Sequence, residues 1–173
     1  IVFPLKFSIE GNTPKLLPLI CTLLVAKILE NVMSLKRLSL GIKWPNDLYK
    51  DNRKVGGVLM HLLPSKLKME SNKIAILGIG INLAWRNRNN KFNASALFDC
   101  IELSKKFNAQ HFVQELTISL DNLENDIIFL KPQIDFNKRD VFKKKHIKVA
   151  INKNKIVSGI NHGIDIHGQL IIK

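Results

Sequence analysis

Apolar residues along this chain of 173 residues recur with two different spacings, one typical of strands and one typical of helices. A broad apolar face at helical spacing predicts a helix over residues 15–32. A second apolar stripe predicts a helix over residues 109–130, with Asn108 as its N-cap. Short apolar runs that predict strands occupy residues 1–7, 38–44, 55–63 and 73–83. This order of elements indicates an α+β fold in which a mixed sheet is flanked by helices.

The last part of the chain has a different character. Residues 135–145 are polar and basic, which predicts a linker. Short strands predicted after this segment lie at residues 146–151, 156–160 and 169–172. We therefore expect two domains, one over residues 1–138 and a small β domain over residues 139–173.

Composition limits the class of protein. Hydrophobic residues make up 46% of the chain, enough for one substantial core. No apolar run reaches the roughly 18 residues of a membrane span, and no secretory signal pattern is present. The cysteines, Cys21 and Cys100, lack metal-ligand spacing. We expect a cytoplasmic protein with reduced thiols, no membrane contact and no bound structural metal.

A formal net charge of +13 raises the question of a nucleic-acid partner. The basic residues are scattered along the chain, however, and only Lys143–Lys145 form a tight run. No helix-turn-helix pattern precedes the domain. We therefore expect no DNA binding, whereas a basic surface would favour encounter with an acidic protein substrate.

The most informative segment covers residues 43–59, where a turn interrupted by proline leads into a glycine pair. A hairpin that sets Tyr49 opposite Lys54 would set Asp47 opposite Gly56. The carboxylate and the ammonium group would then stand diagonally, about 7–8 Å apart at the backbone. An anionic ligand could occupy the gap above the glycine. A solvated hairpin with an ordinary surface ion pair is the alternative interpretation.

Several motifs follow one another in the order of a known family. They are Lys43-Trp44-Pro45-Asn46-Asp47, then Lys54-Val55-Gly56-Gly57-Val58-Leu59, then Gly78-Ile79-Gly80-Ile81-Asn82-Leu83, and last the segment 163–170. The first three resemble the catalytic domain of biotin protein ligases. The last is similar to the hairpin of that family's small C-terminal barrel. The resemblance implies a catalytic domain followed by part of an SH3-like β barrel.

The resemblance implies an ATP-dependent ligase that makes biotinyl-5′-AMP from biotin and ATP in the presence of Mg²⁺. A lysine of the biotin carboxyl carrier protein of acetyl-CoA carboxylase then receives the biotin. Lys54 would stabilise charge in both steps, and Asp47 would orient or deprotonate the acceptor lysine. The other substrate-binding and ATP-binding residues that it implies are Lys43, Trp44, Asn46, Gly56, Gly57, Gly80 and Asn82.

The chain also departs from the family pattern. The Gly-Arg-rich loop expected before the first strand is absent, and the barrel is expected to continue beyond Lys173. His61 stands where the family commonly has Glu. A lipoate ligase, or a binding module that has lost catalysis, therefore remains an alternative. The sequence also leaves a homodimer open.

Overall fold

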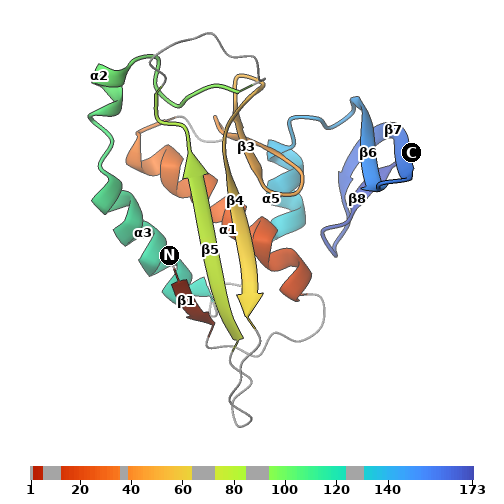
Figure 1. The fold of residues 1–173 in the computed structure, drawn as a ribbon, viewed down its shortest axis with the longest axis horizontal. Coiled ribbons are helices and arrows are strands. Elements are labelled where there is room, and N and C mark those ends of the chain that lie inside the picture. The colour runs from red at the N-terminus through yellow and green to blue at the C-terminus, as the bar shows by residue number, and fades with distance from the viewer. Residues whose placement is uncertain (1, 6–12, 36–38, 64–72, 85–93, 124–130) are drawn as a thin grey trace.

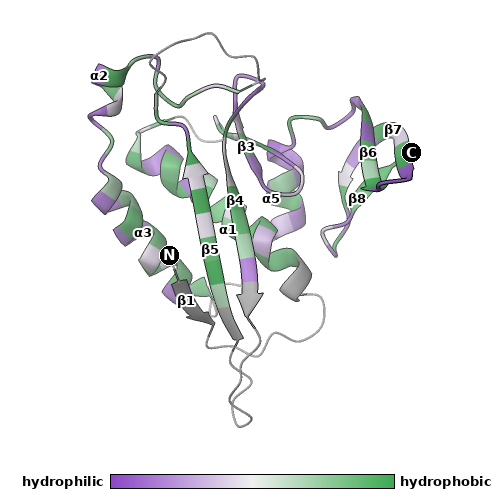
Figure 2. Cartoon of the chain, in the orientation of Figure 1, coloured by the Kyte–Doolittle hydropathy of each residue, from purple (hydrophilic) through white to green (hydrophobic). Residues whose placement is uncertain are grey.

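The computed structural model describes residues 2–5, 13–35, 39–63, 73–84, 94–123 and 131–173 (Figure 1). Its main sheet has five strands in the order β1-β5-β4-β3-β2, and every neighbouring pair of these strands is antiparallel. The strands are β1 (Val2–Leu5), β2 (Gly41–Lys43), β3 (Asp47–Lys50), β4 (Arg53–Leu63) and β5 (Lys73–Ile81). β5 and the middle of β4 are mostly green in the hydropathy view (Figure 2), as expected for the central strands of a sheet.

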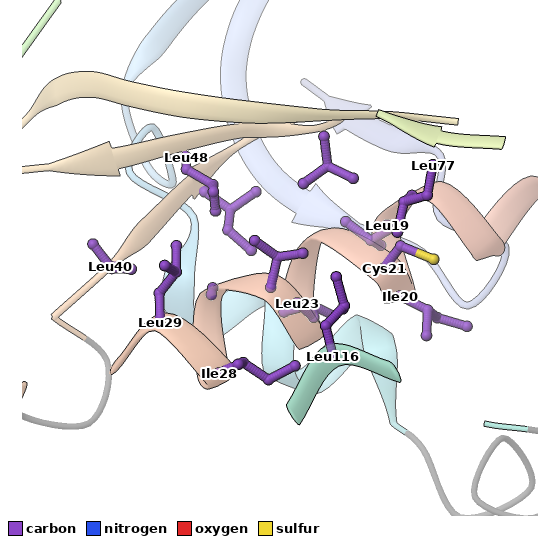
Figure 3. Close-up of a cluster of buried hydrophobic side chains, with 14 of the residues drawn as sticks. Leu19, Ile20, Cys21, Leu23, Ile28, Leu29, Leu40, Leu48, Leu77 and Leu116 are labelled. Atoms are coloured by element: carbon purple, nitrogen blue, oxygen red, sulfur yellow. The ribbon is translucent and has the colours of Figure 1, made fainter. Parts of the chain in front are cut away.

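One long helix covers one face of this sheet. α1 (Thr13–Val32) packs against β4 and is flanked by α3 (Ala109–Asp121) and α5 (Pro132–Arg139). Figure 3 shows Leu48 and Leu77 of the sheet, and Leu116 of α3, among the apolar side chains of α1. α1 is buried on nearly all sides because the sheet and two helices surround it. The expected α+β class, with a sheet flanked by helices, is confirmed. The sheet was expected to be mixed, whereas its described strand pairs are all antiparallel.

The predicted N-cap of the second long helix is present. Asn108 accepts a hydrogen bond from the backbone N–H of His111 at 2.9 Å, so one free donor of the first turn is satisfied. Phe112 and Leu116 of α3 are buried. The helix ends at Asp121, and residues 124–130 of its predicted length lie outside the described residues. A short helix that the pattern did not predict, α2 (Ile101–Ser104), precedes it.

The predicted linker over residues 135–145 is wrong in its first half. Residues up to Arg139 belong to α5, which has a proline in its first turn and lysine and arginine in its last turn. Its composition is polar, but Phe136 is completely buried. Packing of this ring, together with ion pairs to α1, stabilises a helix that has too few apolar residues to be predicted from periodicity.

The C-terminal strands form a separate sheet in the order β6-β7-β8. Their bounds are β6 (His146–Asn152), β7 (Lys155–Ile164) and β8 (Leu170–Ile172). The sheet lies beside α5 (Figure 1). It is open in the part of the chain that the structure describes, so the expected SH3-like barrel is not confirmed. Three strands are too few to curl into closure, for which small barrels need more strands and a fixed stagger.

The thiol of Cys21 is buried among apolar side chains of α1, and this burial raises its pKa to about 12. Cys100 is partly exposed. Among the described residues, no group of His, Cys, Asp and Glu side chains is placed to hold a metal ion. None of the helices in the same ranges is both long and apolar enough to cross a membrane.

Candidate functional site

The centre of the site is an ion pair on the β3–β4 hairpin. The Lys54 ammonium donates to Oδ1 of Asp47 at 2.5 Å, and the Nζ of Lys43 lies 3.8 Å from Oδ2 of the same carboxylate. The Asp47 side chain is 21% exposed, while the lysine side chains are 44% and 47% exposed. The carboxylate therefore lies between two cations that remain accessible to a ligand.

The hairpin itself follows from its turn. Asp51 and Asn52 have φ angles of 51° and 60°, the left-handed conformation that a tight two-residue hairpin turn requires and that Asp and Asn tolerate. The predicted pairing of Tyr49 with Lys54 is confirmed.

The rest of the predicted register is wrong. A β-bulge between Leu48 and Tyr49 shifts the pairing, so Leu48 faces Gly56 and Asp47 faces Gly57. In the observed arrangement the side chains of Asp47 and Lys54 bond directly and do not stand apart across a gap. The space for a ligand therefore lies beside the ion pair, not within it.

That space is an open groove of about 450 Å³ on the main sheet. Strand residues point to alternate faces, and Val58 and Leu77 are buried under α1, whereas Leu59 and Gly78 are exposed. The groove therefore lies on the face away from the core. Its lining consists of Asn46, Asp47, Lys54, Gly57, Val58, Leu59, Gly78, Ile79 and Gly80.

The glycines of the motifs have different roles: Gly57 and Gly80 line the groove, and Gly56 does not. A Cβ on Gly57 would lie 3.3 Å from the Asp47 carboxylate, and a Cβ on Gly80 would meet nothing within 4 Å. Gly56 does not line the groove. A Cβ there would lie only 2.4 Å from the backbone oxygen of Gly80, so Gly56 allows β4 and β5 to approach each other.

The two adjacent glycines give a paired prediction. Gly56→Ala should destabilise the protein by about 1–3 kcal/mol, because backbone must move to admit the methyl group. Gly57→Ala should cost less stability but should narrow the groove beside Asp47. Thermal unfolding checks the first effect and ligand titration the second. Equal unfolding temperatures for the two variants would contradict this division of roles.

The asparagines of the motifs hold backbone. Asn46 donates through Nδ2 to the Val58 oxygen at 2.7 Å, which fixes the turn onto β4 at the edge of the groove. Asn82 donates to the Ser95 oxygen at 3.1 Å and does not line the groove. The segment that Asn82 holds is bonded to the hairpin, since the N–H of Ser95 donates to the Lys54 oxygen.

Trp44 lies away from the groove. Its indole N–H donates to the backbone oxygen of Gly168 at 3.0 Å, and its ring lines a second cavity of about 420 Å³ between the hairpin region and the C-terminal sheet. Phe142 and β6 form other walls of this cavity. Lys43 lines it as well and is the one predicted site residue that reaches both the second cavity and Asp47.

Some neighbours of the site were not predicted. Leu59 is 70% exposed and gives the groove an apolar wall; its only signal in the sequence was a place beside the glycine pair. Tyr49 is buried behind the ion pair and packs edge-on against Phe142 at 5.9 Å between ring centroids. Burial raises the pKa of Tyr49, the Asp47 charge adds to this rise, and the Lys54 charge opposes it. His61 is exposed on β4 and does not line the groove.

This arrangement suits an anionic substrate. Lys54 offers a point charge with donors to spare, and Asp47 offers an acceptor for an incoming amine. The glycine walls let backbone approach the ligand closely, while Leu59 provides apolar contact. Such a site can bind a molecule that is apolar at one end and carries a carboxylate or phosphate at the other.

Known proteins share this sequence pattern and fold. Residues 2–82 match the model of the biotin/lipoate A/B protein ligase family. The bifunctional ligase/repressor BirA of Escherichia coli K12 is 30% identical over 137 residues, which are 76% of this chain and 41% of that protein. The apo biotin protein ligase of Aquifex aeolicus superposes with a TM-score of 0.71 at 21% identity, covering 99% of this chain and 72% of the ligase. The same ligase in complex with biotin and ATP gives 0.67 at 22%, covering 99% and 69%. The chain thus spans 41% of the length of this curated relative.

Proposed function

We propose, starting from this chain's membership of the biotin protein ligase family, that its hairpin and groove carry out biotin activation and transfer. In the first step the biotin carboxylate attacks the α-phosphate of ATP, which forms biotinyl-5′-AMP and releases pyrophosphate. In the second step the amine of an acceptor lysine attacks the acyl carbon of this mixed anhydride and releases AMP. The observation that carries the proposal is the Asp47–Lys54 pair at the wall of a glycine-lined groove.

Lys54 has the geometry for the first step. Its ammonium group lies at the groove wall, 44% exposed, where it can approach oxygens shared between carboxylate and phosphate. A charge fixed in place before the reaction lowers the barrier by stabilising negative charge as it develops. Lys43 adds a second cation near the Asp47 carboxylate. Asn46 fixes the turn between β2 and β3 onto β4.

Asp47 has the geometry for the second step. Its carboxylate faces Gly57, which has no side chain to fill the space beside it. An acceptor lysine that enters through this space would meet Asp47 as hydrogen-bond acceptor or base before it reaches the anhydride. Gly57 and Gly80 would shape the walls around the ligand, while Gly56, Asn82 and Trp44 would act through the backbone they hold.

ATP brings Mg²⁺ with it, and the ion neutralises phosphate charge when bound. Mg²⁺ in nucleotide sites is held largely by phosphates and water, with few protein carboxylates. The described residues fit this mode: they contain no cluster of ligands for a metal, and Asp47, the carboxylate at the groove, is already engaged by lysines. What the chain itself contributes is the charge of Lys54 and Lys43.

The domain division and the partner are part of the proposal. We place the catalytic unit at residues 1–138 and the beginning of a small SH3-like barrel at residues 139–173; the β6-β7-β8 sheet supports the second unit. The proposed acceptor is a biotin carboxyl carrier protein. A homodimer, a cytoplasmic location and the lack of DNA binding remain predictions from the sequence.

Timing the two half-reactions separately tests the proposal. Asp47→Asn should slow transfer from preformed biotinyl-5′-AMP to a carrier domain more than it slows pyrophosphate release, because the amide keeps a hydrogen bond but is no base. The assay should use the longest in-frame protein that contains these residues. Equal losses in both steps would assign Asp47 to ground-state positioning. Formation of a lipoyl-adenylate and no biotinyl-adenylate would reject biotin as the substrate.

A further inference from the structure

Two charged side chains from distant parts of the chain are buried together beside Leu40, the residue before β2. The Arg139 guanidinium donates to both carboxylate oxygens of Glu30, from Nη1 to Oε1 at 2.7 Å and from Nη2 to Oε2 at 2.8 Å. The two side chains are only 2% and 4% exposed. This is a two-pronged arginine–carboxylate pair, a geometry that fixes direction as well as distance.

The pair also holds the backbone of one residue. Glu30 accepts a hydrogen bond from the N–H of Leu40 at 2.9 Å, and Arg139 donates to the oxygen of Leu40 at 2.8 Å. Both polar groups of Leu40 are therefore bonded to buried side chains from α1 and α5. Leu40 is the residue immediately before β2, the strand that leads to Lys43 and the turn of the site.

The residues that follow Arg139 continue along the same strand. The N–H of Val141 donates to the oxygen of Ile42 at 3.2 Å, and the Trp44 indole donates to Gly168. A Cβ on Gly41 would lie 2.2 Å from the Val141 side chain, so contact between the two segments is close. On its other edge, β2 pairs with β3 in a register that sets Lys43 opposite Asp47.

We propose that Glu30 and Arg139 are positioning residues for the Asp47–Lys54 site. They fix the backbone at Leu40, from which β2 runs to Lys43. Because Lys43 pairs with Asp47, the position of β2 also sets the position of Asp47 relative to Lys54. The inference that this geometry affects catalysis rests on the proposed function. The inference about the position of β2 does not.

Packing alone does not account for this pair. A buried ion pair is weak evidence for stability, because the cost of removing two charges from water offsets their attraction. The Nε of Arg139 is buried and has no hydrogen-bond partner, which adds to that cost. An apolar pair could fill the same space, but it could not hold both the N–H and the oxygen of Leu40.

A double variant separates positioning from folding. Glu30→Gln with Arg139→Met leaves no buried charge, and the glutamine keeps an acceptor for the Leu40 N–H. We expect this variant to fold, with amides of residues 41–43 and 47–50 exchanging with solvent on the order of ten-fold faster, as for the loss of a charge-assisted hydrogen bond. Amides of β4 and β5 near Val58 and Leu77 should keep their native rates.

Lys27→Met with Asp135→Asn is the matched control, because it removes the more exposed ion pair between the same two helices. We expect it to leave exchange in β2 and β3 unchanged. Faster exchange confined to β2 and β3, seen in the Glu30→Gln, Arg139→Met variant and absent from the control, supports the positioning role. Equal acceleration over the whole sheet would show a purely structural role and overturn it, as would native exchange in β2 and β3.

Biotin and ATP titration of the same variants tests the functional part. We expect affinity to fall about ten-fold in the Glu30→Gln, Arg139→Met variant and to stay native in the control. If the unaltered protein binds neither ligand, the proposed function fails while the exchange result still decides the positioning role. Native affinity in the double variant would overturn the link between β2 and the site.

Discussion

Replacing Lys54 with alanine is expected to lower the rate of adenylate formation by roughly 10²–10³, the scale for losing one preorganised charge-stabilising group. The ammonium lies at the groove wall and bonds to Asp47, so its removal takes positive charge from the place where phosphate and carboxylate would meet. Stability should change little, because the side chain is 44% exposed and follows a polar turn. Pyrophosphate release from ATP and biotin measures the effect.

Two other lysines of the same region serve as controls. Lys43→Ala removes a cation that lies 3.8 Å from Asp47 but does not line the groove, so its effect should be smaller than that of Lys54→Ala. Lys50→Ala removes a hydrogen bond to the Leu97 oxygen at 2.8 Å and should leave the chemistry intact. Pyrophosphate release at the unaltered rate in Lys54→Ala would show that the charge of this lysine is not used.

The hairpin shows how far local sequence rules reach. A polar turn between apolar runs predicts it, and the structure confirms both the turn and the pairing of Tyr49 with Lys54. The bulge at Leu48 was not predictable, because an extra residue in one strand changes no local pattern and is selected by pairing with neighbours. Because of that single shift, Asp47 faces Gly57 and not the predicted Gly56.

Longer-range features escaped prediction for a related reason. α5 is polar, with one wholly buried ring at Phe136, so its stability depends on what it packs against. Glu30 and Arg139 are 109 positions apart. Each of them, taken alone, would be expected at the surface like most charged residues. The motif predicts Trp44 as a ligand-binding residue, and it gives no sign of the bond from its indole to Gly168 in the turn between β7 and β8. Burial and tertiary partners, which periodicity does not encode, decide these three cases.

Arg139→Met on its own is expected to destabilise the protein by about 3–5 kcal/mol, the usual cost of leaving one partner of a buried ion pair uncompensated. Glu30 would then lose the guanidinium that bonds both of its carboxylate oxygens, and the oxygen of Leu40 would lose its donor. Adding Glu30→Gln should recover much of this loss, because it removes the buried charge. Chemical denaturation of the single and double variants gives both free energies of unfolding.

Lys27→Met supplies the comparison that makes this loss interpretable. It breaks an ion pair between the same helices, α1 and α5, at 2.9 Å, but the Lys27 and Asp135 side chains are 40% and 27% exposed. Solvent screens such a pair, so the expected cost is below about 1 kcal/mol. Burial, not the presence of an ion pair, is then the variable that separates the two results. A cost for Arg139→Met no larger than that of Lys27→Met would mean that Glu30 is rehydrated or neutralised without its partner, and that the position of Leu40 is held by packing alone.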